Sequence, residues 1–260
     1  MATVESIMGV PPAVAVPGQP ASRKPSATEP TSPEARSSAG GPQGETRIFL
    51  SRANWALYEK LLEAIGDGHV RVTYDRGSLE LMAPLYEHDA YARSFGLFVD
   101  RLAVEFEIPY QCGGTTTFRK RAAERGLEAD ECFWIKNVAK ILGKKTIDLE
   151  IDPPPDLAVE IDITKSSLNR LEIYAALGVA EVWRFDGESL FVYHLKDGQY
   201  VLASQSLAFP ILPLGEFTEI LKKSTIVDRL QLSHIFNDWL RTRVVPLWKQ
   251  AQGGGQQSSS

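Results

Sequence analysis

The acidic residues with the clearest chemical potential lie in an apolar stretch, Leu157 to Ile163. The stretch has the length and composition of a buried strand, and strand side chains alternate between two faces. Glu160 and Asp162 therefore share one face, with backbones roughly 7 Å apart. Two carboxylates on such a strand need a cation, a basic side chain or water. A metal site and a solvated sheet face both satisfy that need, and the alternation alone leaves both open.

A second acidic cluster precedes another apolar run, Cys132 to Ile135. It contains Glu128, Asp130 and Glu131. By itself the cluster is typical of a solvated turn that leads into a strand. Together with Glu160, it predicts carboxylates converging from two strands, which is an oxygen-rich site suited to Mg²⁺ or Mn²⁺. Zinc is not expected, because the four histidines lack ligand spacing with each other or with the two cysteines.

Two basic residues follow the strand and are candidates to act beside such a metal. Lys165 lies at the turn after the strand, and Arg170 lies one turn into the next helix. Either side chain could hold a phosphate or a nucleophilic water. The alternative is that both are solvent-facing charges at the start of a helix.

Regular elements that could position these residues are predicted from about Arg47 onward. Ser167 is the expected N-cap of the helix after the acidic strand, and Gly178 is its expected end. The predicted helices are 55–65, 87–106, 167–178 and 227–244, and the predicted strands are 70–74, 79–82, 108–112, 115–119, 132–135, 157–163, 181–185, 190–195 and 200–203. The pattern indicates a mixed α/β domain with a central sheet and one strand–helix–strand crossover.

The two ends of the chain differ from this core in composition. Residues 1–45 are rich in Pro, Ser, Ala and Gly and show no periodicity, so they are predicted to be disordered. Residues 46–246 form the predicted folded domain, and residues 247–260 are predicted to be a flexible polar tail. The closing helix, 227–244, has an apolar stripe that either docks on its own domain or forms a homodimer contact.

Composition limits the classes of partner. The net charge of −5 argues against nonspecific electrostatic binding to nucleic acid or anionic membrane. It does not exclude an enzyme acting on DNA whose metal ions supply local positive charge. No run reaches the roughly 18 apolar residues of a membrane span. Two cysteines are too few for a disulfide framework, and prolines interrupt the N-terminal apolar residues, so a cytoplasmic location is expected.

Three runs resemble one known family. They are PPPDLAVEIDITKSSLNRLEIYAALGVAEVWRFDG, GGTTTFRKRAAERGLEADECFWI and SLELMAPLYEHDAYARSFGLFV. The first resembles the signature of the Uma2-type restriction endonucleases, which belong to the PD-(D/E)xK nuclease superfamily. The resemblance covers roughly residues 47–212 and implies a restriction-endonuclease-like fold, a mixed β-sheet flanked by helices.

The resemblance also implies site residues. Asp130 matches the aspartate of the PD motif, Glu160 matches the acid of the (D/E)xK motif, and Glu87 matches a helix acid that completes such sites. The proline before the motif aspartate is Ala129 here, and Asp162 replaces the motif lysine. Asp162 is thus either a further metal ligand or the mark of a lost lysine. Lys165 or Arg170 would then supply the basic group, although arginine cannot transfer protons at ordinary pH.

The implied activity is Mg²⁺- or Mn²⁺-dependent hydrolysis of DNA phosphodiester bonds, with the metal on Asp130, Glu160, Asp162 and Glu87. Two other functions stay open. The missing lysine favours a catalytically weak or inactive nuclease fold that serves in binding or assembly. A hydrolase acting on another phosphodiester or small molecule would use the same residues.

Overall fold

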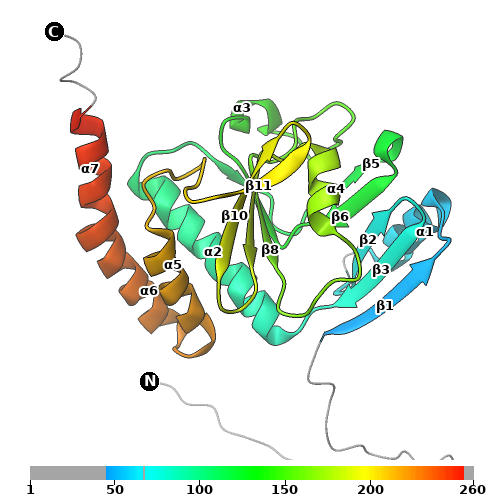
Figure 1. The fold of residues 1–260 in the computed structure, drawn as a ribbon, viewed down its shortest axis with the longest axis horizontal. Helices are drawn as coiled ribbons and strands as arrows, with labels where there is room; N and C mark the ends of the chain where they lie inside the picture. Colours follow the sequence, from blue (N-terminus) through cyan, green and yellow to red (C-terminus); the bar gives the residue numbers. More distant parts are fainter. Residues whose placement is uncertain (1–44, 67, 255–260) are drawn as a thin grey trace, which may run out of the picture. The chain divides into compact units, whose positions relative to one another are not determined.

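Figure 1 shows the computed structural model of the chain, which describes residues 45–66 and 68–254. The first strand, β1 (Thr46–Ser51), begins where folded structure was expected. Almost all of the N-terminal segment predicted to be disordered, 1–45, and the last residues of the predicted tail, 255–260, lie outside the described residues.

Five strands form an antiparallel sheet in the order β1-β3-β2-β6-β5. The predicted hairpin is confirmed, with Arg76 and Gly77 at positive φ in its turn. Helix α1 (Trp55–Ile65) packs on this sheet and is capped by the Asn54 side chain, which accepts the Leu57 N–H. The strands after β1 are β2 (Arg71–Asp75), β3 (Ser78–Ala83), β5 (Thr117–Lys120) and β6 (Arg125–Glu128).

Strand β6 corrects the expectation that Glu128 belongs to a solvated turn. The sequence Arg-Gly-Leu-Glu has no apolar alternation, so the strand gave no signal. Gly126 is required there, because a Cβ at this position would collide with the hydroxyl of Tyr58 on α1. The close packing of α1 against Gly126 therefore holds β6 in place although the strand lacks the usual alternation of apolar side chains.

Six strands form a second sheet in the order β11-β10-β9-β8-β7-β4. Strands β8 and β9 are parallel and are joined by the predicted crossover through α4, whereas the other pairs are antiparallel. The elements are β4 (Gln111–Cys112), β7 (Glu131–Trp134), β8 (Leu157–Ile161), α4 (Arg170–Leu177), β9 (Glu181–Phe185), β10 (Leu190–Lys196) and β11 (Gln199–Ala203). The mixed α/β class is confirmed, with the strands divided between two sheets.

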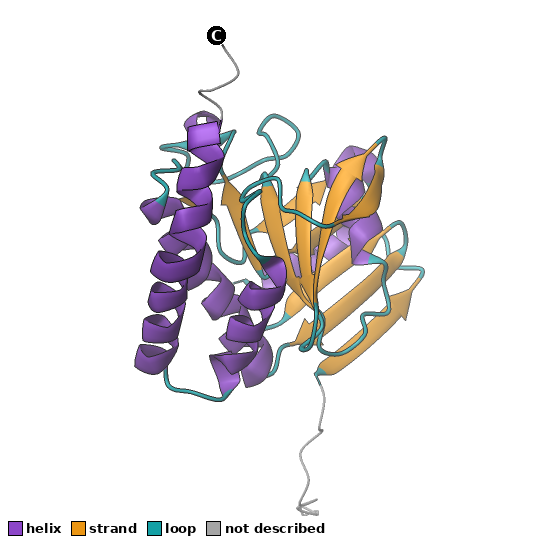
Figure 2. Cartoon of the chain, turned by 60° about the vertical axis from the view of Figure 1, so that its left-hand side comes forward, coloured by secondary structure: helices purple, strands orange, loops and turns teal. Residues whose placement is uncertain are grey.

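Helices cover both faces of the second sheet. Helix α2 (Tyr86–Glu105), α5 (Leu214–Leu221) and α6 (Arg229–Trp239) bury one face, and Figure 2 shows this helical layer beside the strands. Helix α4 and the short α3 (Val138–Ile141) bury the other face. Along β8, Val159 and Ile161 face the α2 layer and Ala158 faces α4, so the predicted alternation is correct.

The closing helix is longer than expected. It was predicted to end at Val244, but a π-helical turn at Leu240–Val244 connects α6 to α7 (Val245–Gly254). The wider turn lets the helix continue past Pro246, which has no N–H to donate. Trp248 of α7 stacks on Phe106, with ring centroids 4.5 Å apart. The first part of the tail expected at 247–260 is therefore helical. No helix in the described part of the chain has both the length and the apolarity to span a membrane.

Candidate functional site

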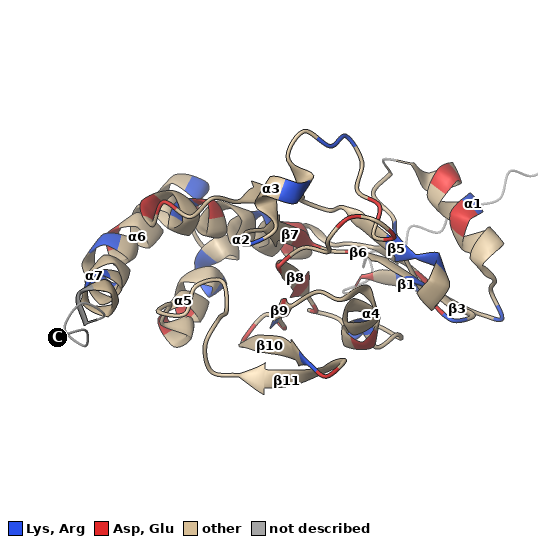
Figure 3. Cartoon of the chain, turned by 90° about the horizontal axis from the view of Figure 1, so that it is seen from above, with Lys and Arg blue, Asp and Glu red and all other residues tan. Residues whose placement is uncertain are grey.

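Asp130 and Glu160 lie side by side where β7 and β8 pair. The N–H of Asp130 donates to the carbonyl of Val159 at 3.2 Å, and the N–H of Ile161 donates to Oδ2 of Asp130 at 2.5 Å. Asp130 is thus bonded to both neighbours of Glu160. The two residues are 1% and 6% exposed, and acidic segments of β7 and β8 adjoin in Figure 3. This places together the two acids that the sequence placed on separate strands.

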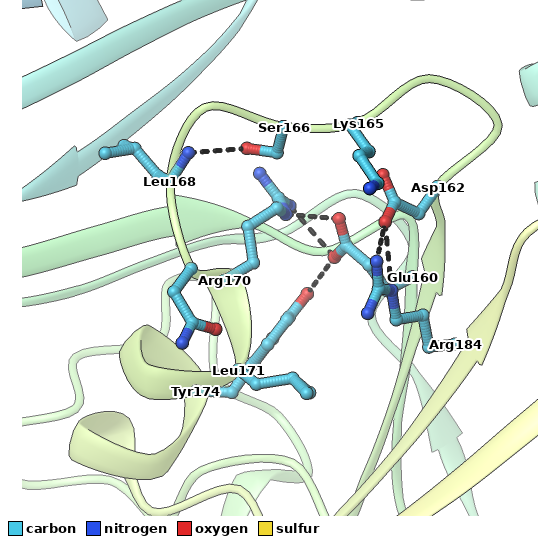
Figure 4. Close-up of a pocket in the computed structure, with 10 residues that line it drawn as sticks. Glu160, Asp162, Lys165, Ser166, Leu168, Arg170, Leu171, Tyr174 and Arg184 are labelled. Atoms are coloured by element: carbon cyan, nitrogen blue, oxygen red, sulfur yellow. Dashed lines mark hydrogen bonds and ion pairs between the residues drawn. The ribbon is translucent and has the colours of Figure 1, made fainter.

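Glu160 is held by α4. The guanidinium of Arg170 meets both carboxylate oxygens, with Nη2 3.0 Å from Oε2. The Tyr174 hydroxyl donates to the same Oε2 at 2.9 Å (Figure 4). Burial and then the charge of Glu160 raise the pKa of Tyr174 well above its ordinary value, so the hydroxyl keeps its proton. Glu160 is therefore a carboxylate enclosed by donors.

Arg170 also connects the two sheets. Its Nη1 donates to the Thr73 hydroxyl on β2, and its Nη2 donates to the carbonyl of Glu128 on β6, both at 2.7 Å. Burial alone would lower the pKa of Arg170, but Glu160 and Tyr174 raise it above its ordinary value. This arginine is a fixed cation and not a source of protons.

Asp130 has partners from β2 and α2. Arg71 forms an ion pair with its Oδ1, and Nε2 of His88 lies 3.2 Å from its Oδ2. Burial, followed by the positive charges of Arg71 and Arg170, lowers the pKa of His88 to about 3. The imidazole is therefore neutral at ordinary pH. Neither Arg71 nor His88 was expected from the sequence, because both reach Asp130 only through tertiary contact.

A cavity of about 190 Å³ opens beside Glu160. Asp162 and Lys165 line it, as do Arg170, Tyr174 and Arg184. Asp162 pairs with Arg184 of β9, whose Nε lies 2.9 Å from Oδ2. Lys165 is exposed and has no ion-pair partner within the described ranges. The cavity therefore combines two carboxylates that have arginine partners with one lysine that is available to a ligand.

Asp130 lines a second cavity, of about 380 Å³, together with Arg71, Asp89, Glu128 and Glu131. Burial raises the pKa of Glu128 and of Glu131 above the usual range. Glu87, the expected helix acid, is exposed and lines neither cavity.

The loop between β8 and α4 is anchored by the first sheet. Glu80 of β3 accepts the Ser166 hydroxyl at 2.9 Å and the Ser167 N–H at 2.7 Å. This contact corrects the expected start of α4, which begins at Arg170 after an Asn169 cap because Ser167 is held in the loop. Sequence reasoning missed Glu80, since its partners lie 86 and 87 positions away. Tyr174 did carry a signal, because it follows Arg170 by four positions on one helix face.

Comparison with known proteins identifies the family. The family model of Uma2, described as "Putative restriction endonuclease", matches residues 55–221. The chain belongs to the Uma2 family. A crystal structure of a putative nuclease belonging to DUF820, from Anabaena variabilis, is similar at 14% identity and a TM-score of 0.40, covering 59% of this chain and 90% of that one. No curated protein matches the chain.

The Uma2 resemblance implies a divalent metal, which needs several oxygen ligands around one point. Asp130 and Glu160 offer buried carboxylate oxygens, the kind that Mg²⁺ and Mn²⁺ take. Among the residues that the structure describes, however, no three His, Cys, Asp or Glu side chains are arranged to hold a metal ion. Arg71 and Arg170 already neutralise the two carboxylates. The donors fit a hard divalent ion in type and burial, and the arginines compete for the same oxygens.

Proposed function

We propose that this Uma2 protein is a DNA endonuclease that hydrolyses phosphodiester bonds with a divalent metal ion. One observation carries the proposal. Asp130 and Glu160, which match the two motif acids of the nuclease superfamily, are buried side by side at the junction of β7 and β8. Burying two carboxylates is costly, so their burial at one point favours a chemical role.

Each residue has a role in the proposed reaction. Asp130 and Glu160 would hold Mg²⁺ or Mn²⁺, and Asp162 is the candidate third ligand because it shares the cavity with Glu160. The bound ion would lower the pKa of a water molecule and offset charge on the phosphate. Lys165, the cavity cation without an ion-pair partner among the described residues, would stabilise that charge. Arg170 would orient Glu160.

A second function has its own supporting observation. Both motif acids have arginine partners, and Arg170 is held at the same time by Thr73 and Glu128. If these pairs persist in solution, the carboxylates cannot take up a metal. The fold would then bind nucleic acid or assemble with other components without cutting, and Lys165 would serve only as a phosphate contact.

Cleavage by matched variants decides between the two functions. Purified chain is incubated with supercoiled and linear DNA in Mg²⁺, in Mn²⁺ and in EDTA. We expect metal-dependent cutting that falls by at least 10²-fold in both Asp130→Asn and Glu160→Gln. Glu63→Gln, an exposed acid on α1, serves as the control and should cut like wild type. Cutting that survives both site substitutions contradicts the site, and no cutting together with no calorimetric Mg²⁺ binding supports the binding fold.

The cytoplasmic location and a homodimer remain predictions. Two copies would place one site on each DNA strand and allow double-strand cuts. The solution mass measured by light scattering tests the dimer, and the ratio of nicked to linear product tests whether both strands are cut together.

A further inference from the structure

The loop that carries Lys165 is fixed on both sides of that residue by the first sheet. Before it, Arg47 of β1 donates from Nη2 to the carbonyl of Thr164 at 3.0 Å. After it, Glu80 of β3 accepts from the hydroxyl of Ser166 and the N–H of Ser167. Arg47 and Glu80 are themselves joined at 2.8 Å. One ion pair on neighbouring strands therefore anchors the backbone around Lys165.

Glu80 is an unusual residue for a sheet interior. It is 1% exposed, and each of its oxygens accepts a hydrogen bond from the loop. A buried carboxylate costs free energy unless its oxygens are used, and an apolar side chain would pack the same strand at lower cost. What Glu80 provides that an apolar residue cannot is a defined position for Ser166 and Ser167.

The cavity makes the position of that loop important. Arg170 and Arg184 line the cavity, but their charges already face Glu160 and Asp162. Lys165 lies in the loop, three positions beyond Asp162, which directly follows β8 and occupies the place of the motif lysine. A strand residue is placed by its sheet, whereas a loop residue is placed only by what anchors the loop.

We propose that Glu80 is a positioning residue for Lys165, which supplies from the loop the cation that is missing at position 162. This role rests on the proposed function. Glu80 does not touch the substrate. It holds Ser166 and Ser167 so that the ammonium of Lys165 meets the phosphodiester in the cavity.

A double-mutant cycle measures the coupling between the two residues. Glu80→Gln keeps the size of the side chain but replaces one acceptor oxygen with a donor, so one loop contact is lost. With the kcat/KM of DNA cleavage as readout, Glu80→Gln and Lys165→Met should each lower the rate by about 10²-fold. The double variant should be no slower than Lys165→Met alone. Glu63→Gln and Lys60→Met, both on exposed parts of α1, are the matched controls.

Two results would overturn the positioning role. If Glu80→Gln lowers the rate by the same factor with or without Lys165, the residue acts on general stability. If Lys165→Met cuts at the wild-type rate, the lysine has no role for Glu80 to support. Thermal midpoints are measured for every variant, because a merely structural role would lower the midpoint without making the rate effects non-additive.

Hydrogen exchange at the Ser167 amide tests the anchor independently of cleavage. In Glu80→Gln the single amide oxygen must face Arg47 and Ser166, which donate to Oε1 of Glu80, so the new NH₂ group faces the Ser167 N–H. We therefore expect slow exchange in wild type and at least tenfold faster exchange in Glu80→Gln. Equal exchange in the two proteins contradicts the anchor, whatever the cleavage rates. A wild-type chain that cuts no DNA but shows the exchange difference overturns the proposed function, and Glu80 is then only a structural contact.

Discussion

Two arginine–carboxylate pairs in this chain have nearly the same contacts. In the site, Glu160 forms a bidentate ion pair with Arg170 and accepts a hydrogen bond from the hydroxyl of Tyr174. On α5, Glu216 receives a two-pronged contact from Arg243, with Nη2 at 2.7 Å and Nε at 3.2 Å. The indole N–H of Trp239 donates to Glu216 at 2.8 Å. Each carboxylate thus has one guanidinium and one aromatic donor.

The pairs differ in burial. The side chains of Arg170 and Glu160 are 9% and 8% exposed, whereas those of Arg243 and Glu216 are 59% and 41% exposed. We call Arg170 and Glu160 the inner pair, and Arg243 and Glu216 the outer pair. Water screens the outer pair, and exposed ion pairs contribute little to stability. The inner carboxylate cannot turn to water if its partner leaves. The same contacts therefore only support helix packing in the outer pair, whereas in the inner pair the carboxylate requires its arginine to remain in place.

The largest expected effect is the loss of the inner arginine. Arg170→Met leaves Glu160 buried without its cation, so the free energy of unfolding should fall by about 3–5 kcal/mol. Arg243→Met is the matched control and should lose far less stability, an effect that disappears in high salt. Urea denaturation of both variants provides the measurement. Equal losses would mean that burial does not distinguish the two pairs.

A divalent metal ion should restore part of the stability that Arg170→Met loses. If Arg170 and a metal ion compete for Glu160, Mg²⁺ should stabilise Arg170→Met more than wild type, by about 2.7 kcal/mol at a concentration 100 times the dissociation constant. The midpoint of urea denaturation is measured with and without Mg²⁺, with Ca²⁺ as a second hard ion. A midpoint that does not respond to either ion in Arg170→Met argues against Glu160 as a ligand.

Removing the Tyr174 hydroxyl, the aromatic donor of the inner pair, should lower the free energy of unfolding by a smaller amount. Tyr174→Phe keeps the ring and removes a hydrogen bond to a buried carboxylate, so about 2 kcal/mol of stability should be lost. Tyr86→Phe, at a residue that is 86% exposed, is the control and should lose almost nothing. Thermal denaturation compares the two. A loss below about 0.5 kcal/mol for Tyr174→Phe would show that Arg170 alone satisfies Glu160.

The smallest effect concerns the outer pair and pH. Hydrogen bonds from Arg243 and then Trp239 lower the pKa of Glu216 to about 2 from an ordinary value of 4.5. Its stabilisation is therefore present above pH 4.5 and is lost as the pH falls toward 2. Screening keeps the amount below about 1 kcal/mol. The free energy of unfolding should depend less on pH across this window in Glu216→Gln than in wild type. The same pH dependence in both proteins would contradict the lowered pKa of Glu216.

The inner site was predictable only as far as local patterns reach. Alternation in β8 placed Glu160, and Gly178 ended α4 as expected, with φ at 84°. The acidic cluster before β7 was expected to converge with Glu160, but only the family resemblance singled out Asp130 within it, because residue types do not determine which side chains of neighbouring strands meet. Arg71, His88 and Glu80 were missed, since an arginine, a histidine or a glutamate in a strand or helix start has no pattern that names its distant partner.

The outer region was missed for a different reason. Helix α5 does have helical spacing, at Leu214, Phe217 and Leu221, but its eight residues are few for recognition by periodicity. The extension to α7 was missed because Pro246 is expected to end a helix, and a π-helical turn compensates for it. In both cases packing on α2 and its neighbours decides the structure, and local preference does not.

Arg170 bridging the sheets has a consequence for the order in which the protein assembles. Its contact with Thr73 spans 97 positions of chain, and the contact of Ser166 with Glu80 spans 86. Closing loops of this size costs entropy before any contact repays it, so such contacts slow folding. The crossover can form from nearby residues, but the charge network around Glu160 closes only after the hairpin of β2 and β3 has docked. The site should therefore be among the last parts of the native chain to form.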